Sequence, residues 1–114
     1  MTDDAAALMY LDIAQLDEVP VGSVRAFSAA GRRIAVYRTA DGVFASDNSC
    51  PHRGGPLAEG DVMSGSIVCP WHLWAFDLKT GCSDVAPELQ LIRHDVRVEG
   101  DRILVRLKTG TEQL

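Results

Sequence analysis

A chain of 114 residues is long enough for one domain, and its formal net charge of −5 argues against nucleic acid or an anionic membrane surface as a partner. Hydrophobic residues make up 46% and charged residues 24%, which excludes an intrinsically disordered chain. No apolar stretch approaches the roughly 20 residues of a membrane span, and the acidic start lacks the positive region of a signal peptide. We expect one cytoplasmic domain over residues 1–114, ordered over about residues 8–107.

Alternation of apolar and other side chains with a period of two predicts short strands through most of the chain. In residues 32–38, Ile34 and Val36 alternate with polar, small or aromatic side chains, a pattern typical of a half-buried strand. Similar runs occur at residues 23–29, 43–46, 66–69 and 75–78. Only residues 13–19 could form a turn or two of helix.

The last third of the chain contains the clearest hairpin. Residues 92–98 place alternate apolar side chains on one face, residues 99–101 form the turn, and residues 103–107 supply the facing row. No long segment has a 3.6-residue period. The sequence therefore predicts an all-β fold.

Two segments that interrupt the alternation carry the residues suited to chemistry. Residues 50–57 read CPHRGGPL and residues 69–74 read CPWHLW, so each supplies one thiol and one imidazole. Sixteen residues separate His52 from Cys69, enough for a strand, a turn near residues 63–65 and a return strand. Both segments are expected to be loops, side by side, with their four donors able to converge.

The four donors Cys50, His52, Cys69 and His72 could bind zinc or an iron-sulfur cluster. Zinc fingers with two cysteines and two histidines usually pair Cys with Cys and His with His. Here each loop mixes the two residue types. A two-iron cluster with one iron held by cysteines and the other by histidines needs that mixture, so a [2Fe-2S] cluster is favoured. A zinc-stapled structural module remains the alternative.

The pattern Cys-x-His, sixteen residues, Cys-x-x-His, with a proline after each cysteine, resembles the Rieske family. The resemblance extends over about residues 8–107. It implies stacked antiparallel sheets with two cluster-binding loops at one tip. It also implies that the cysteine-bound iron is buried and that the histidine-bound iron lies near the surface. Gly54 and Gly55 would let the backbone approach the cluster closely.

The resemblance also bears on the reduction potential. High-potential Rieske proteins of respiratory complexes have an extra cysteine in each loop, forming a disulfide, and Ser and Tyr hydroxyls directed at sulfur. The matching positions here are Gly55, Trp71, Trp74 and Phe76, which supply none of these groups. We therefore expect a potential near the bottom of the span of roughly −150 to +300 mV for Rieske centres.

Soluble ferredoxins that serve ring-hydroxylating oxygenases match this pattern best. Such a protein is a non-catalytic carrier, monomeric when free, whose partners are a flavin-dependent reductase and a terminal oxygenase. The alternative is the small subunit of NADH-dependent nitrite reductase, docked on the large subunit. The chain has no glycine motif for a nucleotide. Leu73 departs from the family, since many members have glycine after the second histidine, and this affects the shape of the tip.

Five further residues are interpreted as structural. Cys82 lies away from both loops and is expected to be a small loop or buried side chain. His94 falls on the apolar face of its strand, where a hydrogen-bonded core histidine is expected. Trp71 and Trp74 are expected to shield the cluster from water, with a direct role in docking a partner as the alternative. Arg53 is interpreted as a solvated surface charge.

Overall fold

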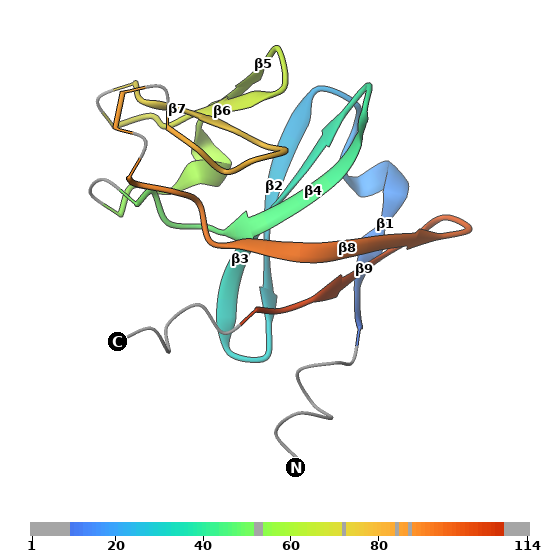
Figure 1. Cartoon of the computed structure of the whole chain (residues 1–114). Helices are drawn as coiled ribbons and strands as arrows, with labels where there is room; N and C mark the ends of the chain where they lie inside the picture. Colours follow the sequence, from blue (N-terminus) through green and yellow to red (C-terminus); the bar gives the residue numbers. More distant parts are fainter. Residues whose placement is uncertain (1–9, 52–53, 72, 84, 87, 109–114) are drawn as a thin grey trace.

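The computed structural model describes residues 10–51, 54–71, 73–83, 85–86 and 88–108, and shows a fold built from antiparallel strands (Figure 1). In chain order the elements are β1 (Leu11–Gln15), the 3₁₀ helix η1 (Leu16–Glu18), β2 (Ser23–Ala29), β3 (Arg32–Thr39), β4 (Gly42–Asp47), the 3₁₀ helix η2 (Leu57–Glu59), β5 (Asp61–Met63), β6 (Ser66–Val68), β7 (Ala75–Asp77), β8 (Arg93–Glu99) and β9 (Arg102–Arg106). The described residues contain no α-helix, which confirms the all-β prediction.

The strands form two sheets. The larger sheet has the order β1-β9-β8-β4-β3-β2, and the smaller has the order β5-β6-β7. Every pair of neighbours is antiparallel. Two hairpins, β2–β3 and β5–β6, turn through a pair of residues with positive φ, a non-glycine residue followed by glycine, as tight turns between twisted strands require.

Most predicted strands occur where the sequence placed them. The runs at residues 23–29, 32–38, 43–46, 66–69 and 75–78 correspond to β2, β3, β4, β6 and β7, with ends that differ by at most one residue. In the predicted hairpin, Val96 pairs with Val105 and Val98 with Ile103, so the two apolar rows face each other as expected.

The prediction that residues 32–38 form a half-buried strand is wrong, because β3 is buried on both faces. Ile34, Ala35, Val36 and Tyr37 all have no exposed surface. The two faces of β3 belong to two separate cores. The apolar core contains Val19, Ala29, Ile34, Val36, Ala45, Ile103 and Val105. The cysteine core contains Val24, Ala35, Tyr37, Cys50, Leu57, Ile67, Cys69, Phe76, Leu78 and Leu91. The small sheet covers the second face through Ile67 and Phe76.

The segment at residues 13–19 is only partly helical. A strand, β1, extends to Gln15, and one short turn of 3₁₀ helix, η1, follows it. The register between β1 and β9 shifts between Asp12 and Ala14, so Ala14 is buried while Leu11 and Ile13 are only partly buried. This bulge breaks the simple alternation by which a strand is recognised.

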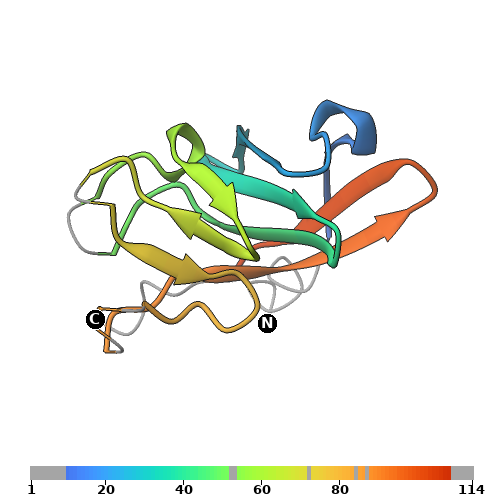
Figure 2. The same cartoon turned by 90° about the horizontal axis from the view of Figure 1, so that it is seen from above.

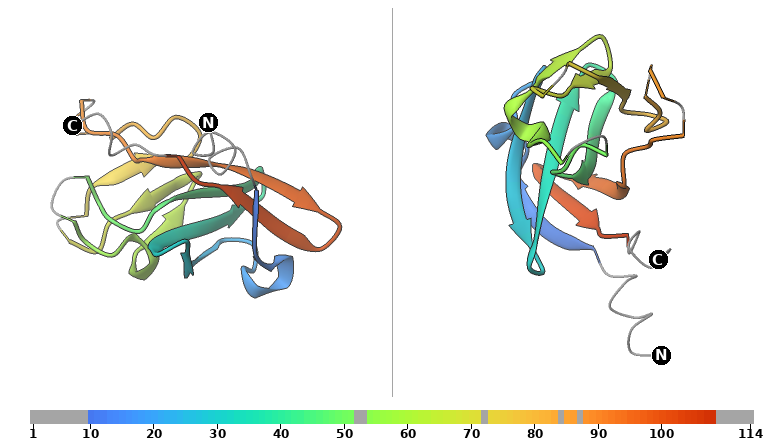
Figure 3. Two further views of the ribbon diagram at one scale, coloured as in Figure 1. Left: turned by 90° about the horizontal axis from the view of Figure 1, so that it is seen from below. Right: turned by 90° about the vertical axis from the view of Figure 1, so that its left-hand side faces the viewer.

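The loops expected to carry chemistry lie at one end of the molecule, and the β8–β9 hairpin lies at the other, as seen from above in Figure 2 and from below in Figure 3. The segments that contain Cys50 and Cys69 meet at the first of these ends. No helix in the described part of the chain is long and apolar enough to cross a membrane.

Candidate metal centre

The first cysteine loop leaves the end of β4 and returns to the short helix η2. Asn48 closes its base, because the Asn48 side-chain oxygen accepts a hydrogen bond of 2.7 Å from the backbone N–H of Ala58. The Asn48 backbone N–H donates to the carbonyl of Arg33 on β3 at 3.1 Å. The loop is thus held to the central strand just before Cys50.

Backbone hydrogen bonds fold the first loop tightly around Cys50. The Cys50 N–H donates to the carbonyl of Gly55 at 2.9 Å, and the Gly54 N–H donates to the carbonyl of Cys50 at 2.7 Å. Gly54 has a φ of +79°, in the left-handed region that side chains disfavour. Glycine adopts this conformation without the strain that a side chain would add.

The second loop follows β6 and is closed in a similar way. The Cys69 N–H donates to the carbonyl of Trp74 at 2.8 Å, which joins the two ends of the loop. The Trp71 N–H lies 3.4 Å from the Cys69 sulfur and donates to it. Hydrogen bonds of this kind stabilise a thiolate and tune a metal bound to it.

The two loops meet at Gly55 and the cysteine sulfurs. A Cβ atom at Gly55 would lie 3.0 Å from the Cys69 sulfur and 2.9 Å from the Trp71 ring, so any side chain there would force these neighbours to shift. Both cysteine side chains are buried. Burial raises the pKa of the Cys69 thiol, the Trp71 N–H lowers it, and the adjacent Cys50 side chain raises it again. Two adjacent buried sulfurs with a backbone donor suit iron or zinc ligation.

The structure brings together two of the four predicted ligands. His52 and His72 lie outside the described residues, as does Arg53. Within the described ranges, no group of three or more His, Cys, Asp or Glu side chains is arranged to hold a metal ion. Cys82 lies in a loop outside both cysteine loops, half-buried, where the Gln90 side chain donates to its sulfur at 3.6 Å.

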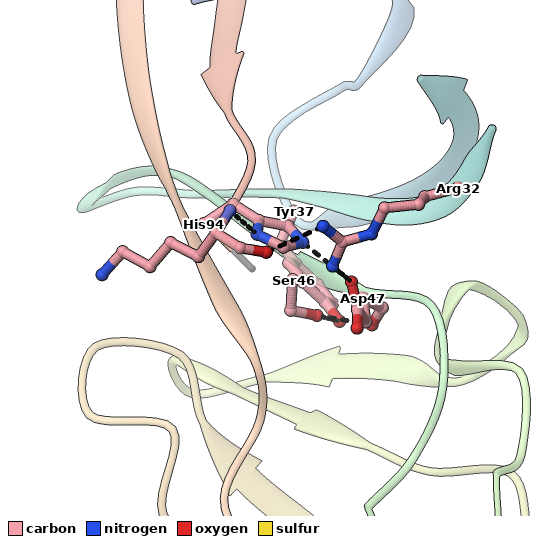
Figure 4. Close-up of polar contacts among 6 residues, drawn as sticks. Arg32, Tyr37, Ser46, Asp47 and His94 are labelled. Atoms are coloured by element: carbon pink, nitrogen blue, oxygen red, sulfur yellow. Dashed lines mark hydrogen bonds and ion pairs between the residues drawn. The ribbon is translucent and has the colours of Figure 1, made fainter. Parts of the chain in front are cut away.

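A pair of buried hydroxyl groups lies in the cysteine core, and sequence reasoning did not predict it. The Tyr37 hydroxyl and the Ser46 hydroxyl are 2.8 Å apart on neighbouring strands, and the Ser46 hydroxyl is also 2.9 Å from the carbonyl of Asp47 (Figure 4). Burial raises the pKa of Tyr37 above its usual range. The phenol therefore stays neutral, and its hydroxyl has a partner inside the core.

A second polar cluster holds the end of β4 next to the first cysteine loop. Asp47 accepts hydrogen bonds from Arg32 at 2.8 Å and from His94 at 2.9 Å (Figure 4). The other ring nitrogen of His94, Nδ1, accepts from the Lys108 N–H at 3.0 Å. Since a backbone N–H can only donate, His94 is the neutral tautomer with its proton on Nε2. The expectation of a hydrogen-bonded core histidine is confirmed.

Burial lowers the pKa of His94, and this effect outweighs the opposing influence of the Asp47 carboxylate. A proton added to Nδ1 would face the Lys108 N–H and break that hydrogen bond. His94 therefore remains neutral at neutral pH and ties the end of β9 to the end of β4. Asp47, to which His94 is bonded, lies three residues before Cys50, so the cluster supports the first loop and is not a site of its own.

Comparison with known proteins gives consistent matches. A family profile described as the Rieske [2Fe-2S] domain matches residues 9–105. The ferredoxin component of the naphthalene 1,2-dioxygenase system of Pseudomonas aeruginosa is 32% identical over 99 residues, which cover 86% of this chain and 95% of the relative.

Two solved structures extend these matches. The ferredoxin of carbazole 1,9a-dioxygenase from Nocardioides aromaticivorans IC177 superposes with a TM-score of 0.79 at 34% identity, over 88% of this chain and 99% of that one. A protein provisionally described as the small subunit of an NADPH nitrite reductase superposes with a TM-score of 0.76 at 21% identity, over 86% and 98% of the two chains. At that identity the second likeness shows the fold alone.

Proposed function

The chain belongs to the Rieske [2Fe-2S] family, whose cofactor is a two-iron cluster that carries single electrons, and we propose that Cys50, His52, Cys69 and His72 hold this cluster. Cys50 and Cys69 would bind one iron, and His52 and His72 the other. The observation that carries the proposal is the meeting of two buried cysteine side chains at the contact between two separate loops.

The residues around the cysteines fit such a cluster. Gly55 allows the first loop to lie against the Cys69 sulfur without the crowded contact that a side chain would make there. The Trp71 N–H donates to that sulfur and so stabilises its negative charge. Trp74 packs against the cysteine core and limits the access of water. These features would suit iron or zinc, and the match to the Rieske [2Fe-2S] family favours a cluster over the zinc alternative.

We propose that the chain passes electrons from a flavin-dependent reductase to a terminal oxygenase of the ring-hydroxylating kind. The proposal draws on relatives named as ferredoxin components of dioxygenase systems that align along nearly their whole length. In this role the chain is a single domain over residues 1–114, catalyses no reaction by itself, acts in the cytoplasm and is monomeric when free. Nitrite reductase remains the competing partner.

The reduction potential of the centre is proposed to be low, near the bottom of the Rieske span. Gly55 occupies one position at which high-potential members carry another residue, and a side chain there would collide with Trp71. The buried Tyr37 hydroxyl is hydrogen-bonded to the Ser46 hydroxyl rather than to a cysteine sulfur. Protein-film voltammetry tests this proposal, and a midpoint well above zero would contradict it.

Anaerobic affinity purification from the native cell identifies the partner. We expect a terminal oxygenase or a flavin reductase among the bound proteins. Recovery of a nitrite reductase large subunit in their place would instead support the competing function. Iron and acid-labile sulfide measured in the same preparation should both be two per chain, whereas zinc without sulfide would contradict the cluster itself.

A further inference from the structure

The second cysteine loop exposes two large apolar side chains, Trp71 and Leu73, on either side of His72 in the sequence. Leu73 has 73% of its surface exposed and Trp71 has 48%. Pro70 beside them is also exposed. Single exposed apolar residues are common on protein surfaces, but a run of them next to a cofactor loop marks a contact surface.

Leu73 is unfavourable to the isolated protein in two ways. Its φ of +60° lies in the left-handed region, where a side chain adds strain. The other non-glycine residues with positive φ in the described part of the chain, Ala30 and Ser64, lie in hairpin turns that demand this conformation. Moreover, most of the leucine surface is exposed and contributes no burial. Glycine at this position would relieve the strain and remove the exposed apolar surface.

The two cysteine loops are almost free of charge. Among residues 50–57 and 69–74 the sequence contains one charged residue, Arg53, although the chain as a whole contains 11 basic and 16 acidic residues. A partner that recognised this end by charge would find little to bind. A partner with an uncharged apolar surface would bury Trp71 and Leu73.

We infer that Trp71 and Leu73 form the docking surface for the redox partner, that the partner offers an uncharged apolar surface around its own electron-accepting centre, and that Leu73 determines how tightly the two proteins bind. The inference rests on the proposed function, because it assumes that electrons leave through this end of the molecule. It explains why a strained and exposed leucine occupies a position where glycine would be more stable.

The test measures turnover with the reductase and oxygenase of the naphthalene 1,2-dioxygenase system, using the cluster-loaded chain as the limiting component. We expect Leu73→Gly to raise the KM for this chain about tenfold with little change in kcat. Leu73→Asn should behave like Leu73→Gly, since asparagine tolerates the left-handed conformation but is polar. Leu73→Met keeps an apolar side chain and should restore a KM near that of the wild type. Val98→Ala, at the far β8–β9 hairpin, is the matched control and should leave KM unchanged.

Two further readouts separate docking from structure. Leu73→Gly should keep the wild-type reduction potential and should have an equal or higher Tm. The wild-type KM should change less than about threefold between roughly 0.05 and 0.5 M salt, as expected for an uncharged interface. An unchanged KM in Leu73→Gly, or Leu73-dependent dimers of the chain in solution, would overturn the inference alone. Failure of the wild type to support any turnover would instead count against the proposed function.

Discussion

The apolar core and the cysteine core lie on opposite faces of the same strand, β3, but they contain different kinds of side chain. Ile34 and Val36 point into the apolar core, where every member is a hydrocarbon side chain. Ala35 and Tyr37 point into the cysteine core, which contains two thiols and a buried hydroxyl pair. The first core can be completed by the chain alone, whereas the second contains the residues that would bind the metal.

This difference implies that stability and function are separable in the molecule. The apolar core contains residues of strands β2, β3, β4 and β9 of the large sheet, and none of its members belongs to the described part of either cysteine loop. The cysteine core joins the small sheet and both loops to β3. We therefore expect mutations in the apolar core to weaken folding with the cluster intact, and mutations in the cysteine core to affect the cluster first.

Loss of a cysteine ligand should have the largest effect. We expect Cys50→Ala to lose the visible absorption of the cluster completely, because the remaining donors cannot hold two irons. The cysteine core should loosen as a result, with a fall in Tm on the order of 10 °C. Metal analysis and thermal unfolding by circular dichroism measure the two effects. Cys82→Ala is the control and should keep the cluster; an intact cluster in Cys50→Ala would refute the ligand assignment.

Truncation in the apolar core should produce the opposite pattern. Ile103 is fully buried there, so Ile103→Ala should lower the free energy of unfolding by about 3 kcal/mol through lost burial and a cavity. The visible spectrum and reduction potential of the folded protein should stay as in the wild type. Urea unfolding and voltammetry on the same samples test this prediction. A shifted potential would show that the two cores are coupled after all.

A methyl group at the contact between the loops should act on the cluster more than on the fold. In Gly55→Ala the new Cβ would meet the Cys69 sulfur and the Trp71 ring. Such overpacking costs about 2 kcal/mol, and we expect slower loading of iron and sulfide together with a changed visible circular dichroism spectrum. Gly65→Ala is the control, because a Cβ there meets open space. It should show only the strain of its positive φ and an unchanged spectrum.

The strands could be predicted because alternation is a local property of the sequence. The double burial of β3 could not, since it depends on the small sheet, whose position is set by contacts far along the chain. Tyr37 illustrates the difficulty: an aromatic residue with a polar tip fits an exposed face as well as a buried one, and its partner Ser46 is brought near only by the register of β3 and β4. The strand β1 could not be predicted either, because its bulge breaks the alternation of apolar residues.

The two cysteine loops were easier to predict than their surroundings. The spacing of cysteine and histidine identified the loops, and the structure confirms that Cys50 and Cys69 meet, whereas the roles of His52 and His72 stay predictions. The sequence indicated that His94 is hydrogen-bonded but not that Asp47 is its partner, because the bond between them joins residues 47 positions apart. Leu73 departs from the family pattern, and its strained conformation gives that departure a physical meaning.

The smallest effect concerns His94 and the pH dependence of stability. Because burial holds the pKa of His94 below its unfolded value of 6.5, the unfolded chain binds a proton first as the pH falls. The contribution of neutral His94 to stability is therefore complete above pH 6.5 and is lost progressively below that pH. We expect a loss of about 1 kcal/mol, the size of one buried hydrogen bond. His94→Asn should remove this component from urea unfolding measured across the pH range; an equal pH dependence in the variant would contradict the assignment.

The central claim is that two of the three histidines bind the cluster, and pulsed EPR of the reduced protein labelled with ¹⁵N-histidine tests it most directly. The account predicts strong couplings to two histidine nitrogens, both retained in His94→Asn, one lost in His52→Cys and one lost in His72→Cys. A cluster that forms normally but shows no histidine nitrogen coupling would contradict the account.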